Sequence, residues 1–231
     1  MTPLAVGVIG GMGPAATVHF MSRILALTPA VRDEDHLRLI VDCNPKVPNR
    51  NEAVKAAGPS PAETLARMAR GLHRAGAEVL VMPCNAAHAF AGAIAAATPL
   101  PFIDLFEATA DEALALGRGP VGVLAADGAL AAGLYQAAFA RRGMGVILRD
   151  AVGQRLFMEL IYRIKAGEVG PGARAEMRRH SDALARAGAR VLVAGCTEIP
   201  LVLSPADIDI PLVDCVDALA RRTIATALPN Q

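Results

Sequence analysis

An internal repeat is the feature of this sequence that most restricts its fold. Residues 75–85 (AGAEVLVMPCN) recur as residues 187–197 (AGARVLVAGCT), at an offset of 112 residues in a chain of 231. Two further pairs of segments match in the same order, at offsets of 110 and 115 residues: 101–104 with 211–214, and 6–9 with 121–124. Because three pairs of segments recur in one order at nearly equal offsets, we expect two similar domains, residues 1–115 and residues 116–231. The repeat leaves open whether the C-terminal helix packs on the first domain.

Short runs of valine, isoleucine and leucine alternate with stretches of helical length along both halves. Such runs are typical of strands covered on both faces, and strands that alternate with helices form mainly parallel sheets. The expected fold class is α/β, with two similar domains, each a mainly parallel sheet flanked by helices, related by a pseudo-twofold axis with the site between them. Ser60 and Glu63, at capping-box spacing, predict the start of one helix, and Gly76 predicts its end. The expected strands are 4–9, 37–43, 78–82, 102–105, 121–125, 145–148, 191–194 and 212–214.

The balance of charge argues against several classes of partner. The chain has 23 basic and 22 acidic residues, a formal net charge of +1 and no basic run, so we expect neither nucleic acid nor a membrane surface as a partner. No apolar run reaches the roughly 18 residues of a membrane span, and the N-terminus lacks the pattern of a signal peptide. We expect a cytoplasmic protein that acts on a small molecule.

The four cysteines do not have the spacing of a zinc site, and disulfides are rare in a reducing cytosol. Cys43 and Cys215 are expected to be small core residues. Cys84 and Cys196 differ because they occupy equivalent places in the repeat, each directly after a buried strand. Ligands of α/β sheets bind at the carboxyl ends of strands, and a thiol there lies near a helix N-terminus, which favours the thiolate.

Two equivalent thiols on opposite sides of one small substrate suit racemisation. One thiolate removes the proton from a stereocentre, and the opposite thiol returns a proton to the other face. A free thiol pKa of about 8.5 lets each group act both as base and as acid near neutrality. The carbanion formed between these steps needs donors directed at the carboxylate, and Asn85, Thr197 and the backbone amides near Met12 and Gly13 are well placed to supply them.

Three segments resemble motifs of the aspartate/glutamate racemase family, and most closely those of its aspartate racemase branch. They are residues 10–17 (GGMGPAAT), 83–88 (PCNAAH) and 195–201 (GCTEIPL). The resemblance implies two α/β domains with the site between them and racemisation of an acidic amino acid such as aspartate or glutamate. It also implies that the enzyme uses no pyridoxal phosphate, no other cofactor and no metal, and that it is a homodimer.

The resemblance also implies which cations bind the substrate. Residues 44–50 resemble a loop that brings in an arginine, here Arg50. Residues 162–167 resemble a segment that brings in a lysine, here Lys165. An arginine fork and a lysine point charge could together hold the side-chain carboxylate.

The motifs around the cysteines complete the predicted substrate-binding set and contain departures from the family. Ala86 and Glu198 each lie two residues after a cysteine and are assigned to that set. Threonine is usual in the family at Ala86, Ala126 and Ala129, so three hydroxyl donors are missing here. Missing donors weaken the binding of the amino-acid head group. A bulkier or otherwise related amino acid, or a broader specificity, therefore gains weight.

Several alternatives remain open. Residues 11–16 follow a strand and open a helix with G-x-G-x-x-A spacing, which is typical of NAD(P)-binding turns, and Asp42 ends the second strand. A glycine-rich turn that lets the backbone approach an anionic substrate explains the same residues. His88 could tune the thiol of Cys84 or simply donate to a backbone carbonyl. Other reactions of related folds are hydantoin racemisation, cis-trans isomerisation and decarboxylation, although the decarboxylases use one cysteine. The non-catalytic alternatives are an amino-acid-binding protein and a dithiol redox protein.

Overall fold

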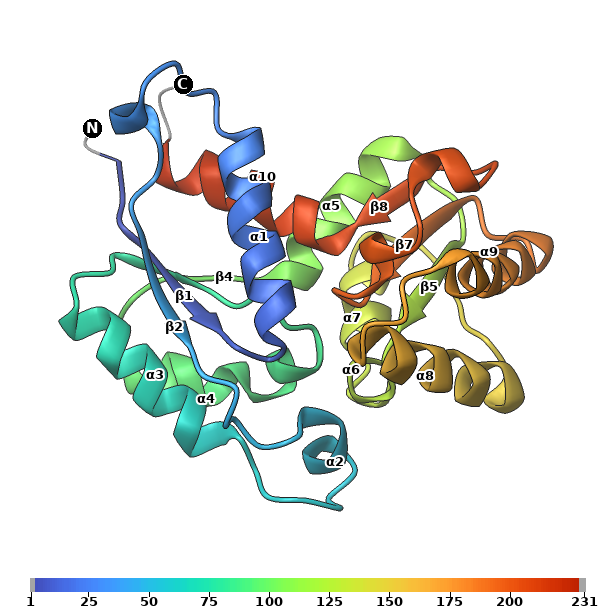
Figure 1. Cartoon of the computed structure of the whole chain (residues 1–231), viewed down its shortest axis with the longest axis horizontal. Coiled ribbons are helices and arrows are strands. Elements are labelled where there is room, and N and C mark those ends of the chain that lie inside the picture. The colour runs from blue at the N-terminus through green and yellow to red at the C-terminus, as the bar shows by residue number, and fades with distance from the viewer. Residues whose placement is uncertain (1–2, 229–231) are drawn as a thin grey trace. The chain divides into compact units, whose positions relative to one another are not determined.

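The structure, a computed structural model, describes residues 3–228 and contains two four-stranded parallel sheets with helices around each (Figure 1). The strands of the first sheet are β1 (Val6–Gly10), β2 (Leu39–Cys43), β3 (Val79–Val81) and β4 (Phe102–Ile103). Those of the second sheet are β5 (Val121–Ala125), β6 (Val146–Ile147), β7 (Val191–Gly195) and β8 (Leu212–Asp214). The helices are α1 (Pro14–Leu27), α2 (Arg50–Val54), α3 (Ala62–Arg74), α4 (Ala91–Ala97), α5 (Leu105–Leu116), α6 (Asp127–Ala131), α7 (Leu134–Ala140), α8 (Ala151–Lys165), α9 (Pro171–Arg186) and α10 (Cys215–Ala227).

The two sheets have the same topology. The strand order is β2-β1-β3-β4 in the first sheet and β6-β5-β7-β8 in the second, with parallel pairing throughout. The central pair of the first sheet aligns Val8 with Val81, and that of the second aligns Ala125 with Gly195. All eight predicted strands are present, with small differences at their ends. The predicted α/β fold with two similar parallel sheets is therefore confirmed.

The chain divides into two compact units whose boundaries differ from the predicted halves. One unit contains the residues up to Leu105 together with those from Val216 onward, and the other contains residues 106–215. The second sheet thus shares its unit with nearly all of α5, and the first sheet with nearly all of α10. A division at residue 115 would place α5 with the first sheet instead. The C-terminal helix α10 belongs to the first unit, which is the arrangement that the repeat left open.

Ion pairs at these two helices lie within the observed units. Asp217 in α10 accepts from Arg23 Nε in α1 at 2.5 Å, and both residues belong to the first unit. Glu107 in α5 pairs with Arg142 in the second unit at 3.0 Å. Contacts of this kind join residues far apart in the sequence, so the repeat could not reveal them.

Each sheet is covered on both faces within its own unit. Figure 1 shows α3 and α4 on one side of the first sheet and α1 on the other. Leu65 of α3 and Leu80 of β3 are fully buried in the core on the α3 side. In the second unit α8 and α9 supply Phe157 and Leu184, which pack with Leu192 of β7. Burial on both faces explains why the strands read as short, almost wholly apolar runs.

The first strand of each sheet carries a glycine where the repeat aligns the halves. A Cβ atom built on Gly7 would lie 2.7 Å from Leu80 Cδ2 and 2.8 Å from Ala77 Cβ. A Cβ atom on Gly122 would lie 2.7 Å from Leu192 Cδ2 and 2.9 Å from the Cβ of an equivalent alanine, Ala189. The repeat therefore preserves a close approach between the central strands and the turn that precedes the second of them.

We expect Gly122→Ala to lower the free energy of unfolding by about 1–3 kcal/mol, because the added methyl group overpacks this contact. The measurement is urea unfolding of the variant beside the parent protein. Gly145→Ala is the matched control, since a Cβ atom there meets nothing within 4 Å. Equal midpoints for the two variants would contradict the argument.

Helix α3 starts close to the predicted position, but the predicted capping box is wrong. Ser60 Oγ accepts from the N–H of Ala62 at 3.2 Å, whereas the Glu63 carboxylate accepts from Arg70 Nη2 at 3.0 Å. The Glu63 carboxylate thus forms an ion pair on the helix surface and does not accept a hydrogen bond from the backbone at the helix N-terminus. The predicted end is confirmed, since Gly76 follows the helix with a φ of +92°.

Two cysteines were expected in the core, and the structure separates them. Cys215 is buried as predicted. Cys43 is exposed, so the prediction for this residue is wrong. It is the last residue of β2, an edge strand whose other residues are only half-buried. An apolar run cannot by itself distinguish an edge strand from a central one.

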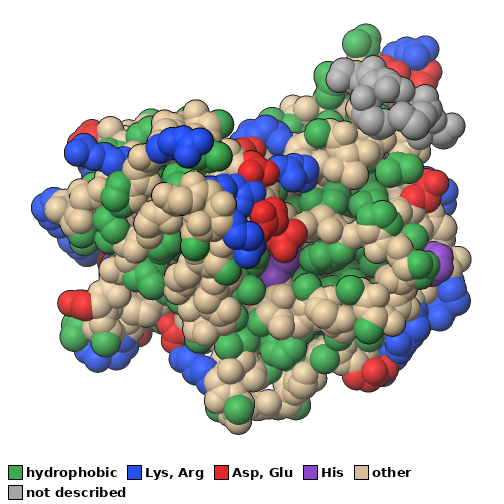
Figure 2. Space-filling view, turned by 180° about the vertical axis from the view of Figure 1, so that it is seen from behind, with side chains coloured by type: hydrophobic (Ala, Val, Ile, Leu, Met, Phe, Trp, Pro, Cys, Tyr) green, Lys and Arg blue, Asp and Glu red, His purple; other side chains and the backbone are tan. Residues whose placement is uncertain are grey.

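Charged side chains are dispersed over the face of the molecule that Figure 2 shows. Figure 2 shows lysine and arginine side chains in separate groups, with acidic and apolar side chains between them. This distribution agrees with the balanced charge of the chain. None of the helices in residues 3–228 combines the length and apolar character needed to cross a membrane.

Candidate active site

The two repeat-equivalent cysteines lie at the topological switch points of their own sheets. The strand order reverses between β1 and β3 and again between β5 and β7, and ligands of α/β sheets bind outside the carboxyl ends of strands at such points. Met12 follows β1 and Cys84 follows β3. Ala126 follows β5 and Cys196 follows β7. The predicted location of each thiol at the carboxyl end of a central strand is confirmed within each unit.

In the first unit Cys84 is tied to the turn after β1. The residue has a relative exposure of 6%, and its S–H donates to the Met12 carbonyl at 3.3 Å. Arg50 Nη2 donates to the same carbonyl at 3.2 Å. Arg50 Nη1 donates to the carbonyls of Val47 and Pro48 at 3.1 and 3.0 Å. The predicted arginine is therefore close to Cys84, and its terminal nitrogens already bind backbone oxygens.

The glycine-rich turn after β1 brings the backbone close to a neighbouring loop. Gly11 has a φ of +90°, and a Cβ atom there would lie 2.3 Å from the backbone nitrogen of Asn44. Its N–H donates to Thr17 Oγ1 at 2.8 Å, which holds the turn against α1. Gly13 is the N-cap of that helix, and a Cβ atom on it would meet nothing within 4 Å. The turn thus leaves open space at the helix N-terminus, where anions bind favourably.

His88 supports the backbone around Cys84. Its Nδ1 lies 2.9 Å from the Cys84 carbonyl, and the Leu105 N–H donates to its Nε2 at 3.4 Å. Since Nε2 accepts, Nδ1 carries the proton and donates to the carbonyl. Burial lowers the pKa of His88, which keeps the ring neutral. Of the two roles considered for this residue, donation to a backbone carbonyl is the one observed.

In the second unit Cys196 lies in a short chain of polar contacts. It too has a relative exposure of 6%, and its S–H donates to Glu198 Oε2 at 3.0 Å. Thr197 Oγ1 donates to the same oxygen at 3.2 Å. Lys165 Nζ donates to Glu198 Oε1 at 2.5 Å. The structure thus brings together four residues predicted for the site, but it pairs Lys165 and Glu198 with each other.

This environment favours the protonated thiol, so the expectation that the end of the strand favours the thiolate is wrong for Cys196. Burial raises the pKa of Cys196 well above its usual value, and the negative charge of Glu198 raises it further. The positive charge of Lys165 acts in the opposite direction. In the absence of a ligand Cys196 is therefore a thiol at neutral pH, ready to donate a proton.

The residues that follow Cys84, and the alanines at which the sequence departs from the family, are buried in their own units. Asn85 and Ala86 directly follow Cys84, and both are buried. Ala126 and Ala129, which lie at the carboxyl end of β5 and in α6, are buried as well. The methyl groups of the three alanines supply packing but no hydrogen bonds.

Arg149 is a polar residue at this edge that the sequence analysis missed. Its Nη2 donates to Gln154 Oε1 at 2.6 Å, and its guanidinium carbon lies 3.9 Å from the centre of the Phe157 ring. Gln154 Nε2 donates in turn to Asp127 Oδ1 at 2.7 Å and to the Ala125 carbonyl at 3.1 Å. The sequence signal was present, since Arg149 lies two residues after the second strand of its half.

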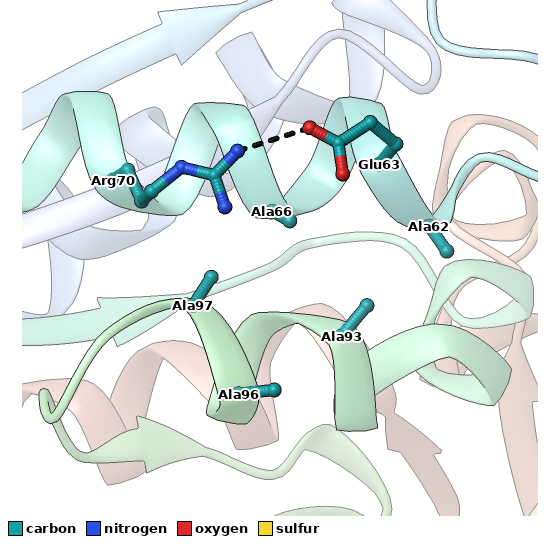
Figure 3. A pocket seen from close by; sticks show the side chains of 7 residues that line it. All are labelled: Ala62, Glu63, Ala66, Arg70, Ala93, Ala96 and Ala97. Atoms are coloured by element: carbon teal, nitrogen blue, oxygen red, sulfur yellow. Dashed lines mark hydrogen bonds and ion pairs between the residues drawn. The ribbon is translucent and has the colours of Figure 1, made fainter.

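A pocket elsewhere in the first unit lacks the groups needed for this chemistry. A hollow of about 260 Å³ between α3 and α4 is lined by five alanines and by the Glu63–Arg70 ion pair (Figure 3). Such a lining offers no nucleophile or base beyond a carboxylate already paired with arginine. Within residues 3–228, no group of three histidine, cysteine, aspartate or glutamate side chains has the arrangement of a metal site.

Comparison with known proteins relates the whole chain to one family. The family model described as Asp/Glu/hydantoin racemase matches residues 9–223. The chain is 25% identical to the broad specificity amino-acid racemase RacX of Bacillus subtilis, over 98% of this chain and 99% of that protein. It is 34% identical to the glutamate racemase of Deinococcus radiodurans, over 68% of this chain and 56% of that protein. The structure of the aspartate racemase of Picrophilus torridus matches with a TM-score of 0.87 and 27% identity, over 96% of this chain and 94% of that one.

Proposed function

We propose that this chain, which belongs to the Asp/Glu/hydantoin racemase family, inverts the configuration of free amino acids by proton transfer between two thiols. The family and the racemase relatives identify it as an isomerase that acts on amino acids. The proposal adds the catalytic groups, Cys84 and Cys196, and the absence of pyridoxal phosphate or any other cofactor. A homodimer in the cytoplasm remains part of it, as the resemblance and the sequence led us to expect.

The observation that carries the proposal is the equivalent placement of the two thiols. Each follows a central strand of its sheet, each has the same low exposure, and each donates its proton to an oxygen of its own unit. In the proposed reaction the Cys84 thiolate takes the α-proton from one face of the substrate, and the Cys196 thiol gives its proton to the other face. The products are a Cys84 thiol, a Cys196 thiolate and the inverted amino acid. The opposite enantiomer reacts by the reverse transfer.

The carbanion between the two transfers is stabilised at the α-carboxylate. We assign this role to Asn85, Thr197 and the backbone amides near Met12 and Gly13, because directed donors in a site that excludes water stabilise developing charge. Thr197 currently donates to Glu198, so its hydroxyl must rotate to reach a substrate.

An acidic amino acid is the substrate we favour, with aspartate or glutamate as the examples. Arg50 and Lys165 are assigned to its side-chain carboxylate, with Ala86 and Glu198 in the surrounding binding set. A broad specificity is the second candidate. It is supported by the alanines at positions 86, 126 and 129 and by the similarity to RacX along nearly its whole length.

The test is exchange of the α-proton in deuterated water, followed by NMR. Purified protein, dialysed against a chelator and with no cofactor added, is incubated with each enantiomer of aspartate, glutamate, alanine, methionine and lysine. We expect deuterium to enter the α-position with inversion. Acidic substrates alone would support the first candidate, and activity across the panel would support the second. Exchange that requires added pyridoxal phosphate or metal would refute the two-thiol proposal.

A further inference from the structure

The guanidinium group of Arg149 has donors that the protein does not use. Its Nε and Nη1 are buried, and neither has an acceptor among the residues that the structure describes. Burying a charged group without a full set of hydrogen bonds is unfavourable. The remaining contacts of the group are one hydrogen bond to Gln154 and the Phe157 ring, whose centre lies 3.9 Å from the guanidinium carbon.

The position of Arg149 is fixed relative to Cys196 through the second sheet. Gln154 joins the guanidinium group to the carbonyl of Ala125, the last residue of β5. Ala125 pairs in the sheet with Gly195, the residue directly before Cys196. Arg149 therefore lies at the same carboxyl edge as the thiol, next to the switch point between β5 and β7.

The electrostatic environment leaves this arginine charged. Burial lowers the pKa of Arg149 to about 10, against the opposing effects of Asp127 and Cys196. A pKa in this range keeps the side chain protonated at neutral pH. The carboxylate of Asp127 is bound by Gln154, so it compensates the positive charge from a distance.

The two cations predicted from the sequence to bind the substrate, Arg50 and Lys165, already bind acceptors within the protein. Both terminal nitrogens of Arg50 donate to backbone carbonyls, which leaves Nε as its one buried nitrogen without an acceptor. Lys165 forms an ion pair with Glu198. A substrate carboxylate would compete with these acceptors, whereas at Arg149 it would meet donors that are already oriented and unused.

We infer that Arg149 is a substrate-binding residue of the second unit, whose guanidinium group donates to a carboxylate of the amino acid. The inference rests on the proposed function for the identity of the ligand and adds a cation to the site. Ion pairs of arginine with carboxylate are among the strongest hydrogen-bonded contacts in proteins. The carboxylate is either the α-carboxylate or the one on an acidic side chain. In the first case every amino acid should need Arg149 for binding, and in the second only an acidic amino acid should need it.

Binding can be measured apart from catalysis in a Cys84→Ser/Cys196→Ser protein. Isothermal titration calorimetry would use L-aspartate, L-alanine and L-alaninamide, which carry two, one and no carboxylates. We expect Arg149→Met, which keeps an apolar stem over Phe157, to weaken aspartate binding about 10–100-fold. Arg155→Met is the control, because Arg155 is an exposed residue of α8, the helix that begins two residues after Arg149.

The pattern of losses identifies the carboxylate. A loss for both aspartate and alanine indicates the α-carboxylate, and a loss for aspartate alone indicates the side chain; either result supports the inference. Unchanged affinities in Arg149→Met overturn it, as does a parent protein that binds neither aspartate nor alanine. Failure of the proposed function is a separate result, since it appears as the absence of α-proton exchange in the protein with both cysteines.

A measurement on the unmutated side chain covers the case in which Arg149→Met does not fold. The Nε–H signal of Arg149 in a ¹⁵N-labelled protein, assigned with Arg149→Lys, should shift when L-aspartate is added and remain in place with L-alaninamide. A merely structural arginine, held by Gln154 and Phe157, would show no selective shift. An unchanged signal at saturating aspartate would overturn the inference.

Discussion

Replacing either Cys84 or Cys196 by serine is expected to lower kcat/KM for racemisation in both directions by a factor of about 10²–10⁴, the range typical of a positioned acid or base. Serine retains the size and hydrogen bonding of cysteine, but its hydroxyl group is far too weak an acid to serve as a base near neutrality. Each thiol has one role in the forward reaction and the other role in the reverse, so neither direction survives. The measurement is circular dichroism of both enantiomers of the substrate identified by exchange.

The matched control is Cys43→Ser, because Cys43 is an exposed cysteine at the end of β2 and has no part in the proposed chemistry. We expect its kcat/KM to equal that of the parent. Thermal unfolding of all three variants separates loss of chemistry from loss of structure. A Cys84→Ser or Cys196→Ser protein that folds and racemises at the parent rate would rule out the two-base mechanism.

The location of these two thiols could be predicted from the sequence because the repeat encodes topology. Strands that are buried on both faces must be short and apolar, and a parallel sheet places their carboxyl ends at one edge. The residue after the third strand of each half is therefore fixed in position once the strand order is known. Cys84 and Cys196 occupy that position, so their burial at the ends of β3 and β7 follows from local patterns alone.

The contacts of the charged side chains could not be predicted in the same way. Lys165 lies at the end of α8, and its partner Glu198 lies 33 residues later, in the turn after β7. Arg149 reaches the edge of β5 only through Gln154. Long side chains have many rotamers, and the sequence does not show which acceptor lies within reach. The exposure of Cys43 was missed for a related reason, since edge and central strands have similar apolar runs.

The second large effect concerns Glu198, which we expect to control the reactivity of Cys196. Ionisation of Cys196 places a thiolate 3.0 Å from a carboxylate oxygen in a buried site, and this repulsion helps to raise the pKa of the thiol. Glu198→Gln removes the charge and should lower that pKa. A fall of one unit gives about tenfold more thiolate at a pH below both values, so alkylation of Cys196 by iodoacetamide at pH 8 should become about tenfold faster.

Lys165→Met should have the opposite effect, because the lysine charge lowers the pKa of Cys196. Alkylation of Cys196 should become slower in this variant, although both substitutions break the same ion pair. Glu159→Gln, at an exposed position of α8, is the control for a change of carboxylate to amide. Peptide mass spectrometry measures Cys84 in the same sample as an internal reference. A change of the Cys196 alkylation rate in the same direction in Glu198→Gln and Lys165→Met would contradict the electrostatic explanation.

The same substitution tests whether this thiol takes part in the reaction. The two enantiomers have equal free energy in water, so kcat/KM must be equal in the two directions and a change at Cys196 cannot favour one of them. The pH profile of a coupled pair reports macroscopic pKa values that belong to both thiols. If Cys196 is one of the pair, the high-pH limb should move to lower pH in Glu198→Gln, equally for both enantiomers. A profile that stays in place while alkylation of Cys196 accelerates would exclude this thiol from the proton transfer.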